Sequence, residues 1–244
     1  PGKKELALTV DVMEYNNSNF VYIPLTNHTS LNCKAIVEVG DHVYVGTEVG
    51  HRTDGINIPM HASISGDVVA IEKKWHRSGK QVLCVKIQND FKYEMDPSCV
   101  PPADSSVLSR EDIVEMIRKN GVVGLGGSGF STYIKYLNPE GIHTVLINGV
   151  ECEPYLTTDY HFMFDQPERF FDGISFLMKA ADVKKGIIAI KKGKKKLKAF
   201  LEQKIDEYQV RDQISVYEVP DAYPLGWEKV LIKTITGREY DRLP

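Results

Sequence analysis

Residues 31–90 alternate short apolar runs with glycine-containing turns, a pattern typical of an all-β region. β-Branched side chains dominate the four runs, which cover residues 36–39, 42–45, 68–71 and 82–85. Turn residues separate them, most clearly in Gly40-Asp41, Ser65-Gly66-Asp67 and Ser78-Gly79. Strands this short, with turn signals this regular, predict a small β-barrel or β-sandwich.

Within this region, V-E-V-G-D-H-V-Y-V-G is followed later by I-S-G-D-V-V-A-I, and the pair resembles the biotinyl/lipoyl carrier fold. A carrier needs a modifiable lysine at the tip between the two halves. Residues 51–63 (H-R-T-D-G-I-N-I-P-M-H-A-S) contain none, so we expect the fold without the swinging-arm function. His51 and His61 lie near that tip and are interpreted as loop residues in preference to metal ligands.

The second half of the chain alternates helix-like and strand-like apolar patterns. Helices are predicted after Ser109 and over residues 129–137, 167–181 and 194–208, and strands over residues 144–147, 186–190 and 214–219. Ser109 can cap the first of these helices and Gly121 ends it. Alternation of this kind predicts an α/β domain with a largely parallel sheet.

The three prolines within residues 93–109 cannot continue either kind of element, so this stretch is predicted to be a linker. We therefore expect a two-part α+β and α/β chain. Its parts are a β-rich barrel-sandwich domain at residues 1–92, the linker, and a Rossmann-like α/β domain at residues 110–244.

Composition excludes several classes of protein. The 244 residues are 42% hydrophobic and 26% charged, with a formal net charge of −3, so the electrostatic case for nucleic acid is weak. No apolar run approaches the ~20 residues that span a bilayer, and the charged start P-G-K-K-E predicts no signal peptide. The four cysteines include no C-x-x-C pair, which predicts no zinc site, iron–sulfur cluster or disulfide framework here and favours a cytosolic or cytosol-facing location.

Residues 121–135, G-V-V-G-L-G-G-S-G-F-S-T-Y-I-K, carry the strongest chemical signal. Glycines this dense usually mark a backbone that approaches a phosphate at the start of a helix. Residues 124–129 satisfy G-x-G-x-x-G, but a helix precedes them, so they are not interpreted as a dinucleotide fingerprint. The ammonium of Lys135 would join such a phosphate cradle. The alternative is a glycine-rich turn that only lets a helix pack closely.

Two further loops follow predicted strands, where α/β sheets place their ligands. Residues 148–154 read N-G-V-E-C-E-P, and their amide and carboxylates suit a ribityl chain, a ribose or a ring nitrogen. The alternative is a solvated acidic loop. Residues 223–229 read Y-P-L-G-W-E-K, and aromatic side chains beside a glycine suit a flat ring system. The alternative there is a packing turn.

Lysines crowd residues 191–198, K-K-G-K-K-K-L-K. Leu197, Phe200, Leu201 and Ile205 give this segment one apolar face, so the lysines are most simply the solvated face of a helix. Nucleic-acid binding is not expected. Attraction to an anionic membrane or an acidic partner stays open.

Taken together, G-L-G-G-S-G-F-S-T-Y-I-K, N-G-V-E-C-E-P-Y-L-T-T-D and Y-P-L-G-W-E-K with a later T-G-R-E resemble the C subunit of the Rnf electron-transport complex. The β-rich region with H-A-S-I-S-G-D-V fits the N-terminal domain of that subunit. The pattern is more distantly similar to the NADH-binding flavoprotein subunit of respiratory complex I and to the cobalamin reductase of propanediol microcompartments.

The resemblance implies an oxidoreductase subunit that binds FMN and NAD(H) and passes hydride between nicotinamide and flavin, with no acid–base catalyst and no metal ligand. It makes Lys135 the counter-ion of the flavin phosphate, Phe130 a stacking platform for the nicotinamide nucleotide, and Glu153 a contact of that nucleotide. The other implied residues line the flavin phosphate (Gly124, Gly126, Gly127, Gly129), hold the ribityl chain or ring edge (Asn148, Glu151) or pack beside the isoalloxazine (Tyr223, Gly226, Glu228).

The sequence departs from the family pattern at four positions. Ser131 replaces a usual proline, and Val150 stands where the complex I subunit has an acidic residue. Leu225 and Trp227 replace a glutamine and a glycine, and an indole at position 227 would narrow the flavin pocket or fill part of the nucleotide site. The alternative to an enzyme is therefore a docking scaffold of the same fold whose cofactor site is blocked or lost.

Family members continue into a β-grasp domain and a ferredoxin-like domain with cysteine-ligated clusters, whereas this sequence ends at Pro244. The resemblance implies that electrons leave through those iron–sulfur clusters, outside these residues. It also implies a cytoplasmic position, peripheral on the membrane through the other subunits of an electron-transport complex, with no direct membrane span.

Overall fold

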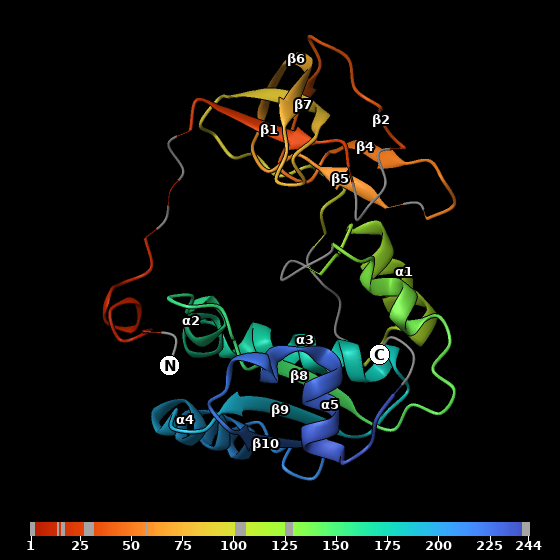
Figure 1. Ribbon diagram of the computed structural model, residues 1–244. Coiled ribbons are helices and arrows are strands. Elements are labelled where there is room, and N and C mark those ends of the chain that lie inside the picture. The colour runs from red at the N-terminus through yellow and green to blue at the C-terminus, as the bar shows by residue number, and fades with distance from the viewer. Residues whose placement is uncertain are drawn as a thin grey trace. The chain divides into compact units, whose positions relative to one another are not determined.

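The computed structural model describes residues 3–13, 15, 18–26, 32–56, 58–100, 106–124 and 129–240. The chain packs as two compact units, both drawn in Figure 1. The α/β unit comprises Pro1–Met13, Ser105–Arg110 and Asn138–Pro244, and the β unit comprises Glu14–Asp104 and Glu111–Leu137.

Two antiparallel sheets form the β unit, with strand orders β1-β7-β6-β3 and β2-β4-β5. The strands are β1 Phe20–Pro24, β2 Cys33–Ala35, β3 His42–Val43, β4 Glu48–Arg52, β5 Pro59–His61, β6 Gly66–Trp75 and β7 Gln81–Asn89. Alternate residues of these strands turn inward, because side chains along a strand point to opposite faces. The inward set forms one apolar core that includes Val43, Val49, Val68, Val85 and Ile87, each at most 1% exposed. The short-strand pattern thus produces the predicted barrel-sandwich.

One predicted strand is wrong. Residues 36–39 follow β2 but do not form a strand: Ile36 N still donates to the carbonyl of Val49 in β4, and the chain then turns at Val39-Gly40. Glu38 N donates to the carboxylate of Asp41 at 2.8 Å, and Gly40 N donates to the carbonyl of Val68 at 2.8 Å. The next run is also shorter than expected, since only its first two residues pair in β3.

Part of the predicted linker packs against the β unit. Val45 and Met95 form an isolated parallel bridge, and Asp96 accepts hydrogen bonds from the Thr47 and Ser98 hydroxyls. Helix α1 (Arg110–Lys119) and the glycine segment after it also group mainly with this unit. The packing units therefore differ from the domain division expected from sequence, and that division stays a prediction.

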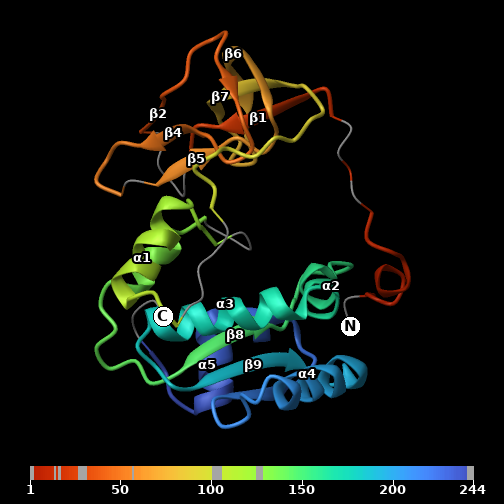
Figure 2. The same cartoon turned by 180° about the vertical axis from the view of Figure 1, so that it is seen from behind.

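A three-stranded parallel sheet with the order β10-β9-β8 lies at the centre of the α/β unit. Its strands are β8 Val145–Gly149, β9 Gly186–Lys191 and β10 Ile214–Val219. The helices are α2 Thr158–Asp165, α3 Pro167–Ala180, α4 Lys195–Glu207 and α5 Glu228–Thr236, with 3-10 turns η1 Ala7–Thr9 and η3 Tyr223–Gly226. Figure 2 shows the same sheet and helices from behind.

Helices cover both faces of β9, which explains why its sequence is almost continuously apolar. On one face, Ala189 packs in a cluster with Leu225 and Leu231 from η3 and α5. On the other face, α3 lies so close to Gly186 that a Cβ there would be 3.0 Å from the Met178 sulfur. The layering of helix, parallel sheet and helix is the predicted α/β architecture.

Most predicted elements of this unit are present within two or three residues of their expected ends. Helix α2 is not predicted by the sequence, and the helix expected at residues 129–137 is a 3-10 turn, η2 (Thr132–Tyr136), that belongs to the β unit. No helix in the described part of the chain is both long and apolar enough to cross a membrane.

Candidate functional site

The carboxyl ends of β8, β9 and β10 lie along one edge of the parallel sheet, where α/β proteins bind their ligands. Each strand is followed there by a segment that the sequence singled out. β8 leads into residues 148–154, β9 into the lysine run, and β10 into η3 and the start of α5.

Hydrogen bonds join the first and third of these segments into one surface. The side-chain amide of Asn148 donates to the carbonyl of Gly226 at 2.8 Å, and Gly226 N donates to the Cys152 sulfur at 2.9 Å. A Cβ on Gly226 would lie 2.6 Å from that sulfur. The glycine is therefore required by close packing between the two loops. Two loops predicted separately thus form a single structural feature.

Glu151 is held from two sides. Its Oε1 accepts from Asp159 N at 2.9 Å, and its Oε2 lies 3.2 Å from the ammonium of Lys4. The side chains of Glu151 and Lys4 are only 6% and 7% exposed. Burial, together with the nearby Glu151 charge, raises the pKa of the Asp159 carboxyl. Sequence reasoning missed Lys4, because nothing local marks a residue so far along the chain from its partner.

Other predicted residues at this edge are exposed. Glu153 and Glu228 lie at the surface, and the Tyr223 side chain is 56% exposed. Asn148 is exposed as well, while Glu151 is held by Lys4 and by the backbone of Asp159. The amide, carboxylates and phenol at this edge have the chemistry to hold a flavin or a nicotinamide, and Asn148 and Glu151 also join the loop to other parts of the unit.

The departures from the family pattern have structural explanations at three positions. Leu225 is 8% exposed and Val150 is 2% exposed, and both belong to the apolar cluster around Ala189. Trp227 is 61% exposed at the N-cap of α5, where its carbonyl accepts from Leu231 N. The indole therefore does not fill the core of the α/β unit.

The glycine segment lies in the β unit, and its residues Gly126 and Gly127 fall outside the described part of the chain. Backbone contacts join the described residues on either side of them. Gly124 N donates to the carbonyl of Phe130 at 2.9 Å, and Val123 bridges Ser131 in antiparallel fashion. Gly129 has a φ of +67°.

Lys135 lies in η2, and its side chain is exposed. Its neighbour Tyr136 is half-buried, and this desolvation raises the pKa of the phenol to about 12. Ser131, the fourth departure, is 1% exposed at the start of η2. The described residues on either side of the glycines are thus joined by a hydrogen bond and a bridge, and an exposed lysine follows them in η2.

The lysine run corrects one expectation. Leu197, Leu201 and Ile205 are at most 2% exposed, so α4 does have the predicted apolar face. Lys191, however, is buried rather than solvated, and its ammonium lies 3.0 Å from the Asp221 carboxylate. The first lysine of the run is therefore a buried residue at the carboxyl end of β9, paired with Asp221.

The two histidines near the tip of the β unit are not loop residues as expected: His51 lies in β4 and His61 is the last residue of β5. His51 Nδ1 lies 2.9 Å from Glu48 Oε1, and burial lowers the pKa of His61. Over the described residues, no group of three or more His, Cys, Asp or Glu side chains is arranged to hold a metal ion.

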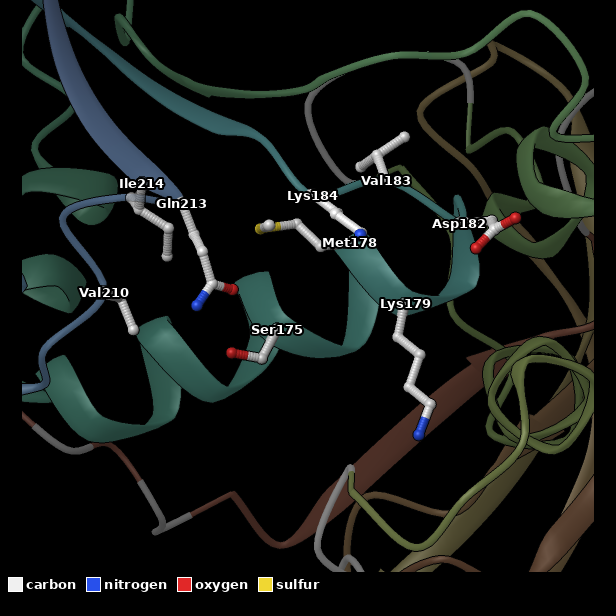
Figure 3. A pocket seen from close by; sticks show the side chains of 9 residues that line it. All are labelled: Ser175, Met178, Lys179, Asp182, Val183, Lys184, Val210, Gln213 and Ile214. Atoms are coloured by element: carbon white, nitrogen blue, oxygen red, sulfur yellow. The ribbon is translucent and has the colours of Figure 1, made fainter.

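A cavity of about 280 Å³ opens at the opposite edge of the parallel sheet, beside the amino ends of β9 and β10. Figure 3 shows its walls, which come from the end of α3, the turn after it and the start of β10. None of the predicted site residues lines it. Because it lies away from the carboxyl edge, this cavity is not part of the candidate site.

The matches to known families follow the two predicted parts of the chain. Residues 117–244 match the Nuo51 FMN-binding domain, and residues 1–92 match the RnfC barrel sandwich hybrid domain. These matches confirm the predicted two-part fold and the flavin-binding type of its second part.

Curated relatives are similar over nearly the whole chain. The C subunit of the Na(+)-translocating ferredoxin:NAD(+) oxidoreductase complex of Acetobacterium woodii is 36% identical over 98% of this chain and 54% of its own length. The C subunit of the proton-translocating ferredoxin:NAD(+) oxidoreductase complex of Clostridium ljungdahlii is 30% identical over 90% of this chain and 48% of its own length. This chain thus spans about half the length of these relatives.

Among solved structures, an NAD+-reducing NiFe hydrogenase in the air-oxidized state is similar with a TM-score of 0.47 and 24% identity, over 56% of this chain and 26% of that chain. The family assignment rests on the domain matches and on the curated relatives. The chain therefore belongs to the Nuo51 FMN-binding family over residues 117–244, carries the RnfC barrel sandwich hybrid domain at residues 1–92, and is homologous to RnfC subunits.

Proposed function

We propose that this chain is the FMN- and NAD(H)-binding part of an Rnf-type electron-transfer subunit, and that hydride passes on it between nicotinamide and flavin. The observation that carries the proposal is the joined surface at the carboxyl edge of the sheet, within residues that match an FMN-binding domain. The names of the relatives, which are ferredoxin:NAD(+) oxidoreductase subunits, support the same chemistry.

In the α/β unit, the exposed Glu153, Tyr223 and Glu228 are the residues that would contact a ring or nucleotide. Asn148 and Gly226 would set the position of the Tyr223 turn through their hydrogen bond. Glu151 would hold the loop through Lys4 and the Asp159 backbone, as well as facing the ribityl chain or ring edge.

In the β unit, Lys135 would supply the counter-charge for a flavin phosphate, and Phe130 would stack on a nicotinamide nucleotide. Backbone N–H groups of a glycine loop suit phosphate because they can approach it without a Cβ. The residues proposed for that cradle are Gly124, Gly126, Gly127 and Gly129.

A bound flavin would supply the hydride acceptor or donor, and the protein's part is to bind, orient and shield it. No side chain needs to move a proton for this step. We further propose that electrons continue to iron–sulfur clusters outside these residues, and that other subunits of a membrane complex hold the chain at the membrane. The relatives are named as subunits of such complexes.

The test is a titration of the purified chain with FMN. Two signals report binding: the fluorescence of the flavin and the melting temperature of the protein. A ligand at about 100 times its Kd stabilises the folded state by about 2.7 kcal/mol, so saturating FMN should quench the flavin and raise Tm by several degrees. If saturating FMN changes neither signal, the chain is the docking scaffold that an indole at position 227 suggests, and the proposed function fails.

A further inference from the structure

A second cavity, of about 460 Å³, lies in the α/β unit at the carboxyl end of β9. β9 ends at Lys191, the chain turns through Gly193, and α4 begins at Lys195. The opposite wall is formed by Tyr160 of α2 and by residues of the N-terminal segment, including Lys4. The cavity is thus lined both by lysines of the lysine run and by a lysine from a distant part of the sequence.

The walls carry a large excess of positive charge. Six lysines and only two carboxylates, those of Glu5 and Asp221, line the cavity. The lysines are Lys4, Lys191, Lys192, Lys194, Lys195 and Lys196. Like charges held this close repel one another, more strongly where water is excluded. The excess therefore favours an anion in the cavity.

The two most buried lysines already have partners. Lys4 pairs with Glu151 and Lys191 with Asp221. Lys194 is half-buried, and its ammonium lies over the Tyr160 ring at 5.2 Å from the centroid. Burial, with the nearby Lys4 and Lys191 charges, lowers the pKa of Lys194, although Glu151 and Asp221 act in the opposite direction. An anion beside Lys194 would relieve this repulsion.

We propose that this cavity is a binding site for a small phosphate anion of two or more charges, such as a pyrophosphate group, held by Lys194, Lys195 and Lys192. Ammonium groups bind phosphate oxygens as charge-assisted hydrogen-bond donors. The first N–H groups of α4, which have no helical acceptor, add donors at the same place. A small anion fits better than a lipid surface, because the lysines surround a hollow of about 460 Å³ and Lys194 is half-buried in it.

The site is coupled to the candidate flavin loop through one side chain. Lys4 lines the cavity and also holds Glu151. An anion that attracts the Lys4 ammonium would therefore weaken its ion pair with Glu151, which holds residues 148–154. This coupling is a consequence of the proposal, and the binding test does not depend on FMN binding.

The experiment is calorimetric titration of the wild-type chain with inorganic pyrophosphate at physiological ionic strength, without flavin. Wild type should bind, and Lys194→Gln should weaken binding by about tenfold or more, since a hydrogen bond to a charged group is worth about 1.5–3 kcal/mol. Lys195→Gln, at an exposed position, should also weaken it. Lys184→Gln removes the same charge from a lysine outside this cavity and should change binding by less than about twofold.

Two further measurements identify the place of binding. Lys135→Ala should leave pyrophosphate binding unchanged; a loss there would put the probe in the flavin phosphate cradle and overturn the proposal. Vesicles with anionic phospholipid should not replace pyrophosphate; binding to vesicles alone would assign the lysines to a membrane surface and overturn it too. Absence of wild-type binding, or equal losses in Lys194→Gln and Lys184→Gln, would also overturn it.

Discussion

Gly226 leaves no room for a side chain, because a Cβ there would be 2.6 Å from the Cys152 sulfur. We expect Gly226→Ala to destabilise the protein by about 1–3 kcal/mol, the usual cost of forcing extra volume into a packed site. Urea unfolding measures this loss of unfolding free energy, provided that its dependence on urea concentration is the same in variant and wild type. The same variant should weaken FMN binding, because the turn carries Tyr223.

Two further variants test whether the clash with Cys152, and not the replacement of a glycine by alanine as such, causes the loss of stability. Gly173→Ala in α3 meets no heavy atom within 4 Å and should be neutral or stabilising. Combining Gly226→Ala with Cys152→Ala removes the clashing sulfur and should restore most of the lost stability. A double variant as unstable as Gly226→Ala alone would show that the contact with Cys152 is not the reason.

Lys135 is proposed to act only on the flavin phosphate. Lys135→Ala should therefore weaken FMN by about tenfold or more, the worth of one charge-assisted hydrogen bond, and riboflavin by less than about twofold. Fluorescence titration with both flavins makes the comparison within one protein. Equal losses for FMN and riboflavin would remove the counter-ion role.

At the residue scale, the structure shows contacts of the predicted site residues that the sequence does not reveal. Asn148 and Glu151 are expected to face a ligand, and they also bond to Gly226, Asp159 and Lys4. These partners come from distant parts of the chain, so no local pattern points to them. Leu225 and Val150, which depart from the family pattern, are core residues, and only packing could show that.

Among the elements, the segment at residues 95–98 is fixed to the β unit by Asp96. Hydrogen bonds from Ser98 and Thr47 lower the pKa of Asp96 to about 2, from an ordinary value of 3.8. The folded state binds this proton less tightly than the unfolded state, so the stabilisation is present above pH 3.8 and is lost as the pH falls toward about 2.

Asp96→Asn should therefore make stability less dependent on pH in that acid range, while at neutral pH it should unfold more easily than wild type. Chemical unfolding across the acid range measures both effects. Glu94→Gln, a neighbouring exposed carboxylate, is the matched control. An unchanged acid slope in Asp96→Asn would contradict the assigned role.

Elements with a clear apolar pattern are predicted well. Burial on both faces makes β9 almost continuously apolar, and burial on one face gives α3 and α4 their helical period. Short elements are not predicted well. Residues 36–39 look like a strand, but the chain turns at Val39-Gly40, and Glu38 N bonds to the Asp41 side chain in place of a strand partner. Helix α2 has no strong apolar stripe to reveal it, since its only buried residue is Met163.

At the scale of the whole molecule, the packing units could not be predicted from composition. The N-terminal residues group with the α/β unit through Lys4, and the glycine segment groups with the β unit. Both groupings rest on contacts between residues far apart in sequence. The order of the two family matches along the chain, by contrast, follows the order of the predicted parts.

We propose that the loops of this chain hold a flavin where a nicotinamide can reach it. The most direct measurement is anaerobic mixing of the FMN-loaded protein with NADH while the absorbance of oxidised flavin is followed. We predict that stoichiometric NADH bleaches the bound flavin, and does so faster than it bleaches free FMN. A bound flavin that stays oxidised with NADH, yet is reduced by dithionite, would contradict the account.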